Sequence, residues 1–347
     1  MADQAAAETI LEPDLPIVDP HHHLWDRRIP PGTGPVRHGF ENVMRLAPRY
    51  LHDELLADLT RGHNVVATVF VQCGSMYRAD GPAHLKPVGE TEFVNGVAAM
   101  SASGLDGQVR ACAGIVGHVD LTQSEHEIAE GLEAHLRAGG GRFRGIRHSA
   151  SYDADVEVLG PLARQTPHLY PSDAFRNGFA RFAKFGLSFD AWLLEPQLPE
   201  FLDLARAFPE TIFILDHVGT PLGIGSYAGK RQERFPVWRD VIKAIGACEN
   251  VYVKLGGLAM PFAGFDSFMQ SHPSSVLAQE WKPYIETCIE AFTPARAMFE
   301  SNFPVDLCSC TYDVLWNALK LTAQGYSADE KADLFAGAAK RAYRLEL

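Results

Sequence analysis

The sequence of 347 residues predicts a single (β/α)8 barrel. Short apolar segments typical of buried strands recur along the chain, and amphipathic segments typical of helices lie between them. Polar and charged residues follow almost every predicted strand, at the ends where such barrels carry their active sites. We expect residues 15–347 to form the barrel, in an ideal or a distorted form, after an N-terminal extension at residues 1–14.

Eight segments have the length and apolar composition of buried parallel strands. They are Ile17–Val18, Val65–Val71, Val109–Val116, Phe143–Ile146, Leu187–Phe189, Thr211–Leu215, Val251–Leu255 and Ala297–Phe299. An open, doubly wound sheet is the competing fold. No Gly-x-Gly-x-x-Gly motif follows the first strand, and Gly139-Gly140-Gly141 precedes a strand and is typical of a helix stop. The barrel is therefore the better prediction.

Amphipathic segments separate these strands, and the pattern predicts helices at Leu51–Arg61, Ser124–Arg137, Pro199–Phe208, Phe235–Cys248 and Gln279–Phe292. Pro199 suits a helix start, and Pro283 is expected in the first turn of its helix, where a missing N–H costs least. Gly32–Pro35 and Gly223–Gly229 are expected to be loops over the barrel mouth.

Two helices are predicted near the C-terminus. Tyr312, Leu315, Trp316 and Leu319 follow helical spacing. Ser327-Ala328-Asp329-Glu330 has the form of a capping box, which predicts a last helix with Leu334 and Phe335 facing inward.

The composition indicates a globular protein, with 46% hydrophobic residues and a formal charge of -12. This charge disfavours nucleic acid and anionic membranes as partners and favours solubility. The six cysteines include no Cys-x-x-Cys pair, so we expect reduced thiols in a cytoplasmic protein without a signal peptide. A homo-oligomer is a common state for such enzymes and is left open.

Three consecutive histidines end the first predicted strand. Because successive side chains of an extended chain point to opposite faces, His21 and His23 share one side and His22 points to the other. Two imidazoles on one face can bind a single divalent metal ion. The alternatives are a solvated polar loop or a purification tag, and a tag is disfavoured because the run is short and embedded in an apolar segment.

The other strand ends carry a further set of polar residues. In chain order these are Gln72 and Cys73, His118 and Asp120, Arg147 and His148, Asp190 and Trp192, Asp216 and His217, Lys254, and Glu300 to Asp306. Because the carboxyl ends of parallel strands meet at one end of a barrel, we expect these side chains to face a common site.

Each candidate has a functional and a structural interpretation. His217 is a metal ligand or acid–base group, or a hydrogen-bonded core histidine. Arg147 binds a substrate carboxylate or lactone carbonyl, or pairs with a carboxylate between strands. Lys254 binds substrate or forms a buried ion pair. His148 and Asp190 are further substrate-binding candidates, while Trp192, Trp25 and Phe303 are expected to form the pocket wall.

Three motifs resemble the amidohydrolase superfamily over most of the chain, from Leu15 to the C-terminus. They are Asp19-x-His21-x-His23, Asp216-His217-Val218-Gly219 and Ser301-Asn302-Phe303-Pro304-Val305-Asp306. Within the superfamily the chain is most similar to the lactonase group that includes sugar lactonases, 4-sulfomuconolactone hydrolase and 2-pyrone-4,6-dicarboxylate lactonase.

The resemblance implies metal-assisted hydrolysis on a distorted (β/α)8 barrel, although some lactonases of the group need no metal. His21 and His23 match the metal pair of the first strand, and His217 matches the histidine of the sixth strand. Arg147 matches an arginine that anchors substrate. One divalent ion is expected, Zn²⁺ first and Mn²⁺ as the alternative.

Two departures from the superfamily pattern matter. Asn302 stands where an aspartate usually binds metal and accepts a proton, and an amide cannot accept that proton. Asn302 can still bind a metal or water, and Glu300 or Asp306 is a candidate for the missing carboxylate. No histidine ends the fifth strand, where the metal-dependent decarboxylases of the superfamily have a ligand.

The sequence therefore predicts a metal-dependent hydrolase that opens a lactone of a small, anionic organic acid. One alternative is a non-oxidative decarboxylase of an aromatic or enol acid on the same barrel. A second alternative is a barrel that binds ligand but has lost catalysis, as Asn302 would allow.

Overall fold

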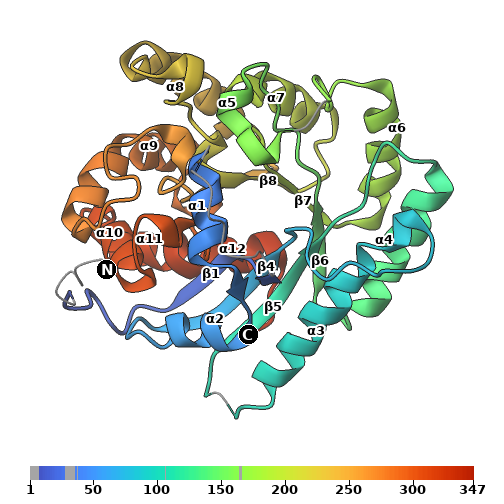
Figure 1. Cartoon of the computed structure of the whole chain (residues 1–347), viewed down its shortest axis with the longest axis horizontal. Helices are drawn as coiled ribbons and strands as arrows, with labels where there is room; N and C mark the ends of the chain where they lie inside the picture. Colours follow the sequence, from blue (N-terminus) through green and yellow to red (C-terminus); the bar gives the residue numbers. More distant parts are fainter. Residues whose placement is uncertain (1–7, 28–35, 37, 106, 164–165) are drawn as a thin grey trace.

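A computed structural model describes residues 8–27, 36, 38–105, 107–163 and 166–347. Eight parallel strands form a ring in chain order, with helices around it (Figure 1). The strands are β1 (Ile17–His22), β4 (Val65–Val71), β5 (Arg110–Gly117), β6 (Phe143–Arg147), β7 (Ser188–Ala191), β8 (Phe213–Leu215), β9 (Val251–Leu255) and β10 (Ala297–Phe299). All eight predicted strands are confirmed, with ends that differ by a few residues.

The ring closes just beyond the end of β10. A parallel bridge joins His22 to Phe303. The backbone N–H of Asn302 donates to the carbonyl of His21 at 2.9 Å, and that of His23 donates to the carbonyl of Phe303 at 2.8 Å. The predicted (β/α)8 barrel is therefore confirmed, and the ends of its first and last strands lie side by side.

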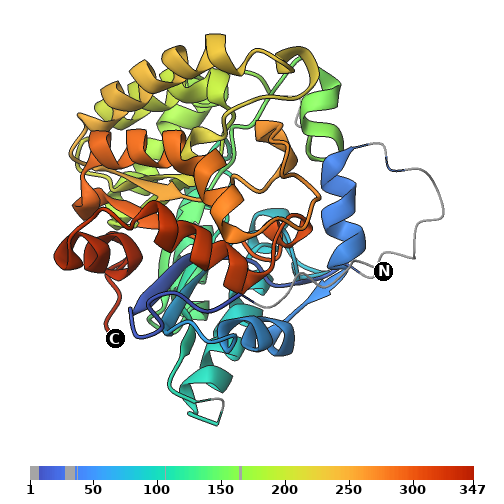
Figure 2. The same ribbon diagram turned by 90° about the vertical axis from the view of Figure 1, so that its left-hand side faces the viewer.

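Helices cover the outside of the barrel, and Figure 2 shows α8, α9 and α10 packed next to one another. The helices are α1 (Gly39–Leu46), α2 (His52–Leu59), α3 (Val88–Ala102), α4 (Glu125–Ala138), α5 (Val156–Leu159), α6 (Asp173–Phe182), α7 (Leu198–Ala207), α8 (Arg231–Gly246), α9 (Ser274–Phe292), α10 (Tyr312–Thr322), α11 (Ala328–Ala332) and α12 (Ala338–Tyr343). After β1 in the chain come β2 (Trp25–Asp26) and β3 (Arg49–Tyr50), which pair as a separate two-stranded antiparallel sheet.

The predicted position of Pro283 is wrong. Helix α9 begins at Ser274 and not near Gln279, so Pro283 lies inside the helix. Pro273 precedes the first turn, and the buried side chains of Leu277 and Trp281 continue the inner face of the helix. Helix α8 likewise begins four residues before the predicted Phe235, at Arg231, and contains Pro236.

The last helix closes one end of the barrel. The capping box of Ser327 and Glu330 is present, and Leu334 and Phe335 are buried as predicted. A π-helical turn at Asp333–Gly337 separates α11 from α12. Residues of α12 pack in one cluster with inward-facing strand residues, which are Val18, Ala67, Val69, Val71, Val116, Ile214 and Met298.

Residues 8–12 of the predicted extension are tied to α10. The amide of Asn317 donates to the carbonyl of Thr9 at 3.0 Å, and the Lys320 ammonium donates to the carbonyls of Leu11 and Glu12 at 2.9 and 2.8 Å. The predicted loop Gly32–Pro35 lies outside the described residues. Gly223–Gly229 forms a loop with one helical turn, and Ile224 and Tyr227 of this loop pack against a core cluster that includes Trp25.

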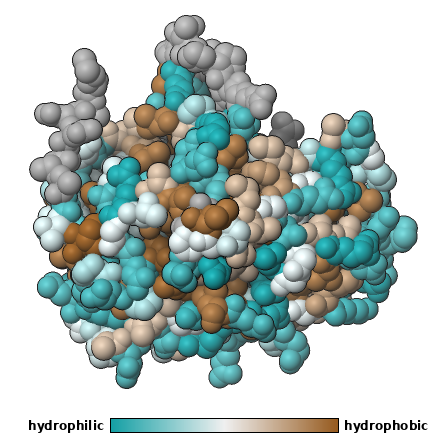
Figure 3. Space-filling view, turned by 90° about the horizontal axis from the view of Figure 1, so that it is seen from below, coloured by the Kyte–Doolittle hydropathy of each residue, from teal (hydrophilic) through white to brown (hydrophobic). Residues whose placement is uncertain are grey.

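The described surface is mixed in character. On the face shown in Figure 3, hydrophilic residues cover much of the surface, and hydrophobic residues form separate groups between them. All six cysteines are free thiols. Among the described residues, no helix is both long enough and apolar enough to cross a membrane.

Candidate active site

One buried carboxylate joins two of the predicted site histidines. His217 donates from Nδ1 to Oε1 of Glu300 at 2.7 Å. Nδ1 of His21 lies 2.7 Å from Oε2 of the same carboxylate, although the angle is poor for a hydrogen bond. The two imidazole rings are 4.6 Å apart. Glu300 follows β10 directly, so the last strand positions the residues of the first and sixth.

The backbone after β8 turns His217 into the barrel. His217 and Val218 have φ values of 56° and 49°, in the left-handed region that side chains disfavour. The neighbouring Gly257 also has a positive φ, and a Cβ there would lie 2.5 Å from the His217 ring. The imidazole of His217 is thus held in place by a strained backbone at its own position and by the lack of a side chain at Gly257.

His21, Asp216 and His217 could hold a metal ion. One ligand atom of each lies within 4.8 Å of the others, and all three residues are buried. Oδ1 of Asp216 and Oε2 of Glu300 are buried without an aligned hydrogen-bond donor. Burial, followed by the positive charge of Lys254, holds the pKa of His21 well below its usual value. A neutral imidazole beside a buried carboxylate is a donor set that fits a divalent cation.

His23 lies beside this group but is not one of its three members. Its ring meets that of His21 edge-on at 4.9 Å, while Nδ1 lies 2.8 Å from the carbonyl of Val71. Nε2 is therefore the nitrogen left for a ligand, and a metal role for His23 stays a prediction. His22 points to the other side of the strand, where its Nε2 lies 2.8 Å from the Thr68 hydroxyl.

Lys254 forms a buried ion cluster behind the histidines. Its ammonium lies 2.7 Å from Asp190, 2.9 Å from Oδ1 of Asp216 and 3.2 Å from Nδ1 of His21. Burial alone would lower the pKa of Lys254, but the charges of Asp190 and Asp216 outweigh it and raise that pKa. The hydroxyl of Tyr343, from α12, donates to Asp190 at 2.6 Å. The contacts of Lys254 and Asp190 are therefore those of a buried ion pair.

Arg147 has contacts that fit both of its predicted roles. Nη1 lies 3.5 Å from Oδ2 of Asp216 and 3.3 Å from Nε2 of His21, which is the ion pair between strands. Nη2 donates to the carbonyl of Gln72. The side chain also lines a cavity, so its guanidinium can meet a ligand there.

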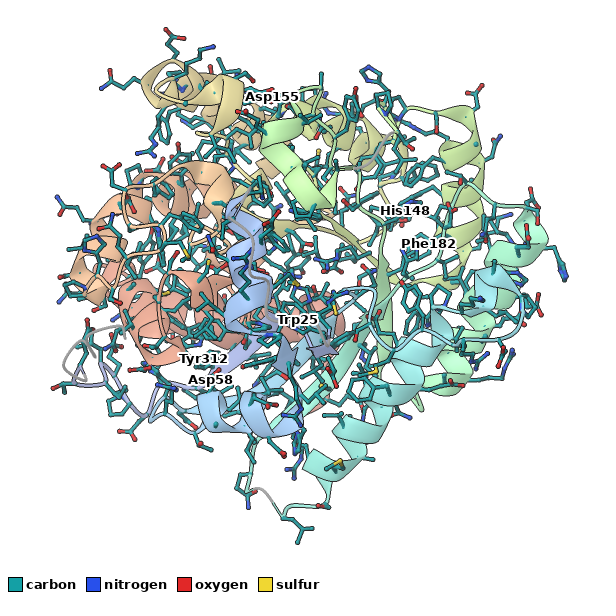
Figure 4. All side chains as sticks on the ribbon, viewed as in Figure 1. Trp25, Asp58, His148, Asp155, Phe182 and Tyr312 are labelled. Carbon is teal, nitrogen blue, oxygen red and sulfur yellow. The ribbon has the colours of Figure 1, made fainter. Side chains whose placement is uncertain are left out.

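We call this cavity, of about 130 Å³, the first chamber. Its polar lining consists of His23, Arg27, Gln72, Cys73, Arg147, Ser149, His217 and Asn302, and its apolar lining of Trp25, Phe40, Met44, Leu162, Trp192, Met260 and Val305. Figure 4 labels Trp25 near the middle of the view. Trp192 and Trp25 thus form walls as predicted, whereas Phe303 is wholly buried and packs against Tyr312 at 5.1 Å. The predicted wall role of Phe303 is wrong.

The asparagine that departs from the superfamily pattern is paired with an aspartate. Asn302, with a φ of 54°, donates from Nδ2 to Oδ1 of Asp306 at 2.8 Å. Burial raises the pKa of Asp306 well above its usual value. Asn302 lines the first chamber, and Asp306 lies behind it and is not among the lining residues. The catalytic roles of both residues stay predictions.

A second cavity lies next to the first and contains His148. This second chamber, of about 470 Å³, shares Gln72, Cys73 and Ser149 with the first chamber. Figure 4 shows His148 to the upper right of Trp25. His148 is therefore in a position to contact a ligand only if that ligand extends beyond the first chamber.

Some site residues had no role in the sequence prediction. Glu90, from α3, accepts from the backbone N–H groups of Cys73 at 3.2 Å and Ser75 at 2.7 Å, which fixes the wall shared by the chambers. Burial raises the pKa of Glu90 to about 7. Helix α3 was not predicted, so nothing in the sequence pattern pointed to Glu90. The signal for Asp216 was its position next to His217.

Comparisons with known proteins agree with this fold and show the family. The amidohydrolase family model matches residues 18–345. An uncharacterized protein, y4mH, of Sinorhizobium fredii is 33% identical over 96% of this chain and 99% of its own length. An L-fucono-1,5-lactonase of Burkholderia multivorans is 27% identical over 67% of this chain and 72% of its own length. An amidohydrolase structure with bound zinc, also from B. multivorans, superimposes with a TM-score of 0.70 at 25% identity, covering 95% of this chain and 99% of the other.

Proposed function

The chain belongs to the amidohydrolase family, and from this premise we propose that it hydrolyses the lactone of a small hydroxylated organic acid with the help of one divalent metal ion. The observation that carries the proposal is the buried group of His21, Asp216 and His217, with Glu300 behind both imidazoles. The lactonase of B. multivorans and the zinc-bound amidohydrolase support the reaction and the metal, respectively.

His21, Asp216 and His217 would hold the ion, with His23 as a further ligand through Nε2. Zn²⁺ is our first choice and Mn²⁺ the second. When bound, such an ion polarises a carbonyl or lowers the pKa of a water molecule. Glu300 fixes the tautomer of His217 by accepting from Nδ1, so Nε2 is the nitrogen available to a ligand, or to a proton if His217 acts as an acid–base group.

The other residues would bind and orient the lactone. Arg147 directs its guanidinium at the carbonyl or the carboxylate that forms on ring opening. The amide of Asn302 would position the attacking water, with Asp306 holding that amide by the hydrogen bond at 2.8 Å. Trp25 and Trp192 would pack on the ring of the lactone and exclude solvent. Because all six cysteines are free thiols, we also assign the protein to the reducing cytoplasm.

The test combines metal analysis with hydrolysis. Purified protein is analysed for metal content, and a panel of lactones, including L-fucono-1,5-lactone, is followed by acid release. We expect about one ion per chain, and loss of both metal and activity in His21→Ala. His126→Ala, on the exposed face of α4, is the matched control. Protein without metal that keeps full activity after His21→Ala would rule out the metal role. Carbon dioxide release from an aromatic or enol acid, with no lactone of the panel hydrolysed, would favour a decarboxylase.

A further inference from the structure

The second chamber adjoins the first at the mouth of the barrel. It lies beyond the ends of β4, β5 and β6, and three residues line both cavities: Gln72, Cys73 and Ser149. With about 470 Å³ against about 130 Å³, it is the larger of the two spaces. A ligand whose reacting group lies against His217 and Arg147 would have to pass the side chain of Gln72 to reach this chamber.

Gln72 connects the two chambers through its side chain. Its amide Nε2 donates to the hydroxyl of Tyr77 at 3.3 Å, in the wall of the second chamber. Its Oε1 lies 3.5 Å from Nε of Arg147, which lines the first chamber. Gln72 thus lies between Arg147 and the second chamber, where it would contact a substrate bound to Arg147.

The wall of the second chamber is rich in hydrogen-bonding side chains. Its polar residues include Tyr77, His118, Asp120, Thr122, His148 and Ser151. None of the residues that the structure describes as lining it is a lysine or an arginine, and Asp120 adds a carboxylate. Such a surface matches hydroxyl groups, which both donate and accept, and is unfavourable for a second anion.

The side chains of this wall are held in place before any ligand binds. Nδ1 of His118 lies 2.9 Å from the carbonyl of Arg147, and the rings of His118 and His148 meet edge-on at 5.2 Å. The backbone N–H of Leu121 donates to Nδ1 of His148 at 3.3 Å. Because the groups are already oriented, binding costs little ordering of side chains.

We propose that the second chamber is a substrate subsite for a neutral, hydroxyl-rich unit attached to the lactone, so that the preferred substrate is a lactone carrying a second, sugar-like unit. This inference rests on the proposed lactone hydrolysis for its position next to the reacting centre. It differs from the expectation of a small acid in assigning a larger substrate to the site.

The kinetic test compares a small lactone with an extended one. Glucono-δ-lactone is a single sugar-acid ring, whereas lactobiono-δ-lactone carries an additional galactosyl unit. We expect kcat/KM for the extended lactone to exceed that for the small one by about tenfold or more, since several hydrogen bonds are added. Thr122→Trp, at the exposed rim of the second chamber, should lower this ratio to near one, while Thr122→Ser should keep it. Leu162→Trp, in the first chamber, should impair both substrates.

A binding test separates this inference from the proposed function. Calorimetry with gluconate and lactobionate, the two open acids, requires no turnover. Tighter binding of lactobionate by about tenfold, lost in Thr122→Trp, supports the subsite even if neither lactone is hydrolysed. Equal binding of the two acids, or a kinetic ratio that Thr122→Trp leaves unchanged, overturns it even if the protein is a lactonase.

Discussion

Oε1 of Glu300 accepts a hydrogen bond from Nδ1 of His217 at 2.7 Å, in a site where both side chains are buried. This contact fixes which imidazole nitrogen carries the proton and leaves the other available to a ligand. Glu300 therefore acts on the site through two histidines, since its second oxygen lies 2.7 Å from His21. Residues behind metal ligands commonly affect metal affinity almost as strongly as the ligands do.

Replacing Glu300 with glutamine is expected to weaken zinc binding by about 10–100-fold, because the neutral amide removes the negative charge beside both imidazoles and can turn its NH₂ group toward His217. Titration calorimetry with Zn²⁺ measures this affinity. Glu290→Gln, an exposed glutamate on α9, serves as the control and should bind zinc like the wild type. Equal affinities in the two variants would mean that Glu300 does not support the ligands.

Replacing Lys254 with methionine leaves Asp190 and Asp216 buried without their ammonium partner. We expect the free energy of unfolding to fall by about 3–5 kcal/mol, as for other buried ion pairs that lose one member. Added Zn²⁺ should restore more stability to this variant than to the wild type, because the ion would replace the missing positive charge. Urea unfolding with and without zinc tests both statements.

The control for that experiment is Lys243→Met, an exposed lysine of α8. Its unfolding should resemble that of the wild type with and without zinc. If Lys254→Met were equally stable without zinc, Lys254 would not be the counter-ion that its distances indicate.

His135 makes stability depend on pH. Burial is the main reason why its pKa falls from the usual 6.5 to about 4. A lowered histidine pKa contributes stability above pH 6.5, and this contribution is lost as pH falls from 6.5 to 4, because the unfolded chain then binds a proton that the folded one excludes. The loss should reach about 3 kcal/mol. Urea unfolding at several pH values measures it.

His135→Gln is expected to remove that part of the pH dependence. A glutamine can keep contacts to the Thr91 hydroxyl and the His118 carbonyl, which lie 2.8 and 3.0 Å from the imidazole, but it does not titrate. His126→Gln, on the exposed side of the same helix, should leave the pH dependence as in the wild type. A wild-type slope that survives in His135→Gln would contradict the assignment.

The Asn302–Asp306 pair can be tested by exchange. Asn302→Asp would bring two carboxylates into contact where Nδ2 now donates to Oδ1 at 2.8 Å, and should lower the free energy of unfolding at pH 8 by about 1–3 kcal/mol. The double variant Asn302→Asp/Asp306→Asn restores one donor and one acceptor and should recover much of the loss. Additive effects of the two substitutions would show that the pair is not coupled.

The sequence predicted the barrel because several of its strands are continuous apolar runs, such as Phe213–Leu215, whose composition alone indicates burial on both faces. It did not predict α3, in which apolar and polar residues are mixed around the helix and leave no clear periodic face. The start of α9 was also missed, since Pro283 suggested a helix beginning later than Ser274.

The candidate site was predicted in part. His21 and His217 could be identified because each follows a strand, and all strand ends meet at one mouth. The role of Glu300 depends on which way its side chain points after β10, and that of Tyr343 on a contact with Asp190 across the barrel interior. Neither follows from local sequence, because both are fixed only when the ring of strands has closed.

The closure between β1 and β10 has a consequence for heat resistance. Backbone hydrogen bonds from Asn302 to His21 and from His23 to Phe303 cross it, and Ser301 donates to Asp19 there. Glu300 and His21 face each other across the same closure. A local opening there would separate the two residues while the other strands remain paired. On heating, the protein should therefore lose its activity reversibly before it melts, and the joint between its first and last strands would set its working temperature.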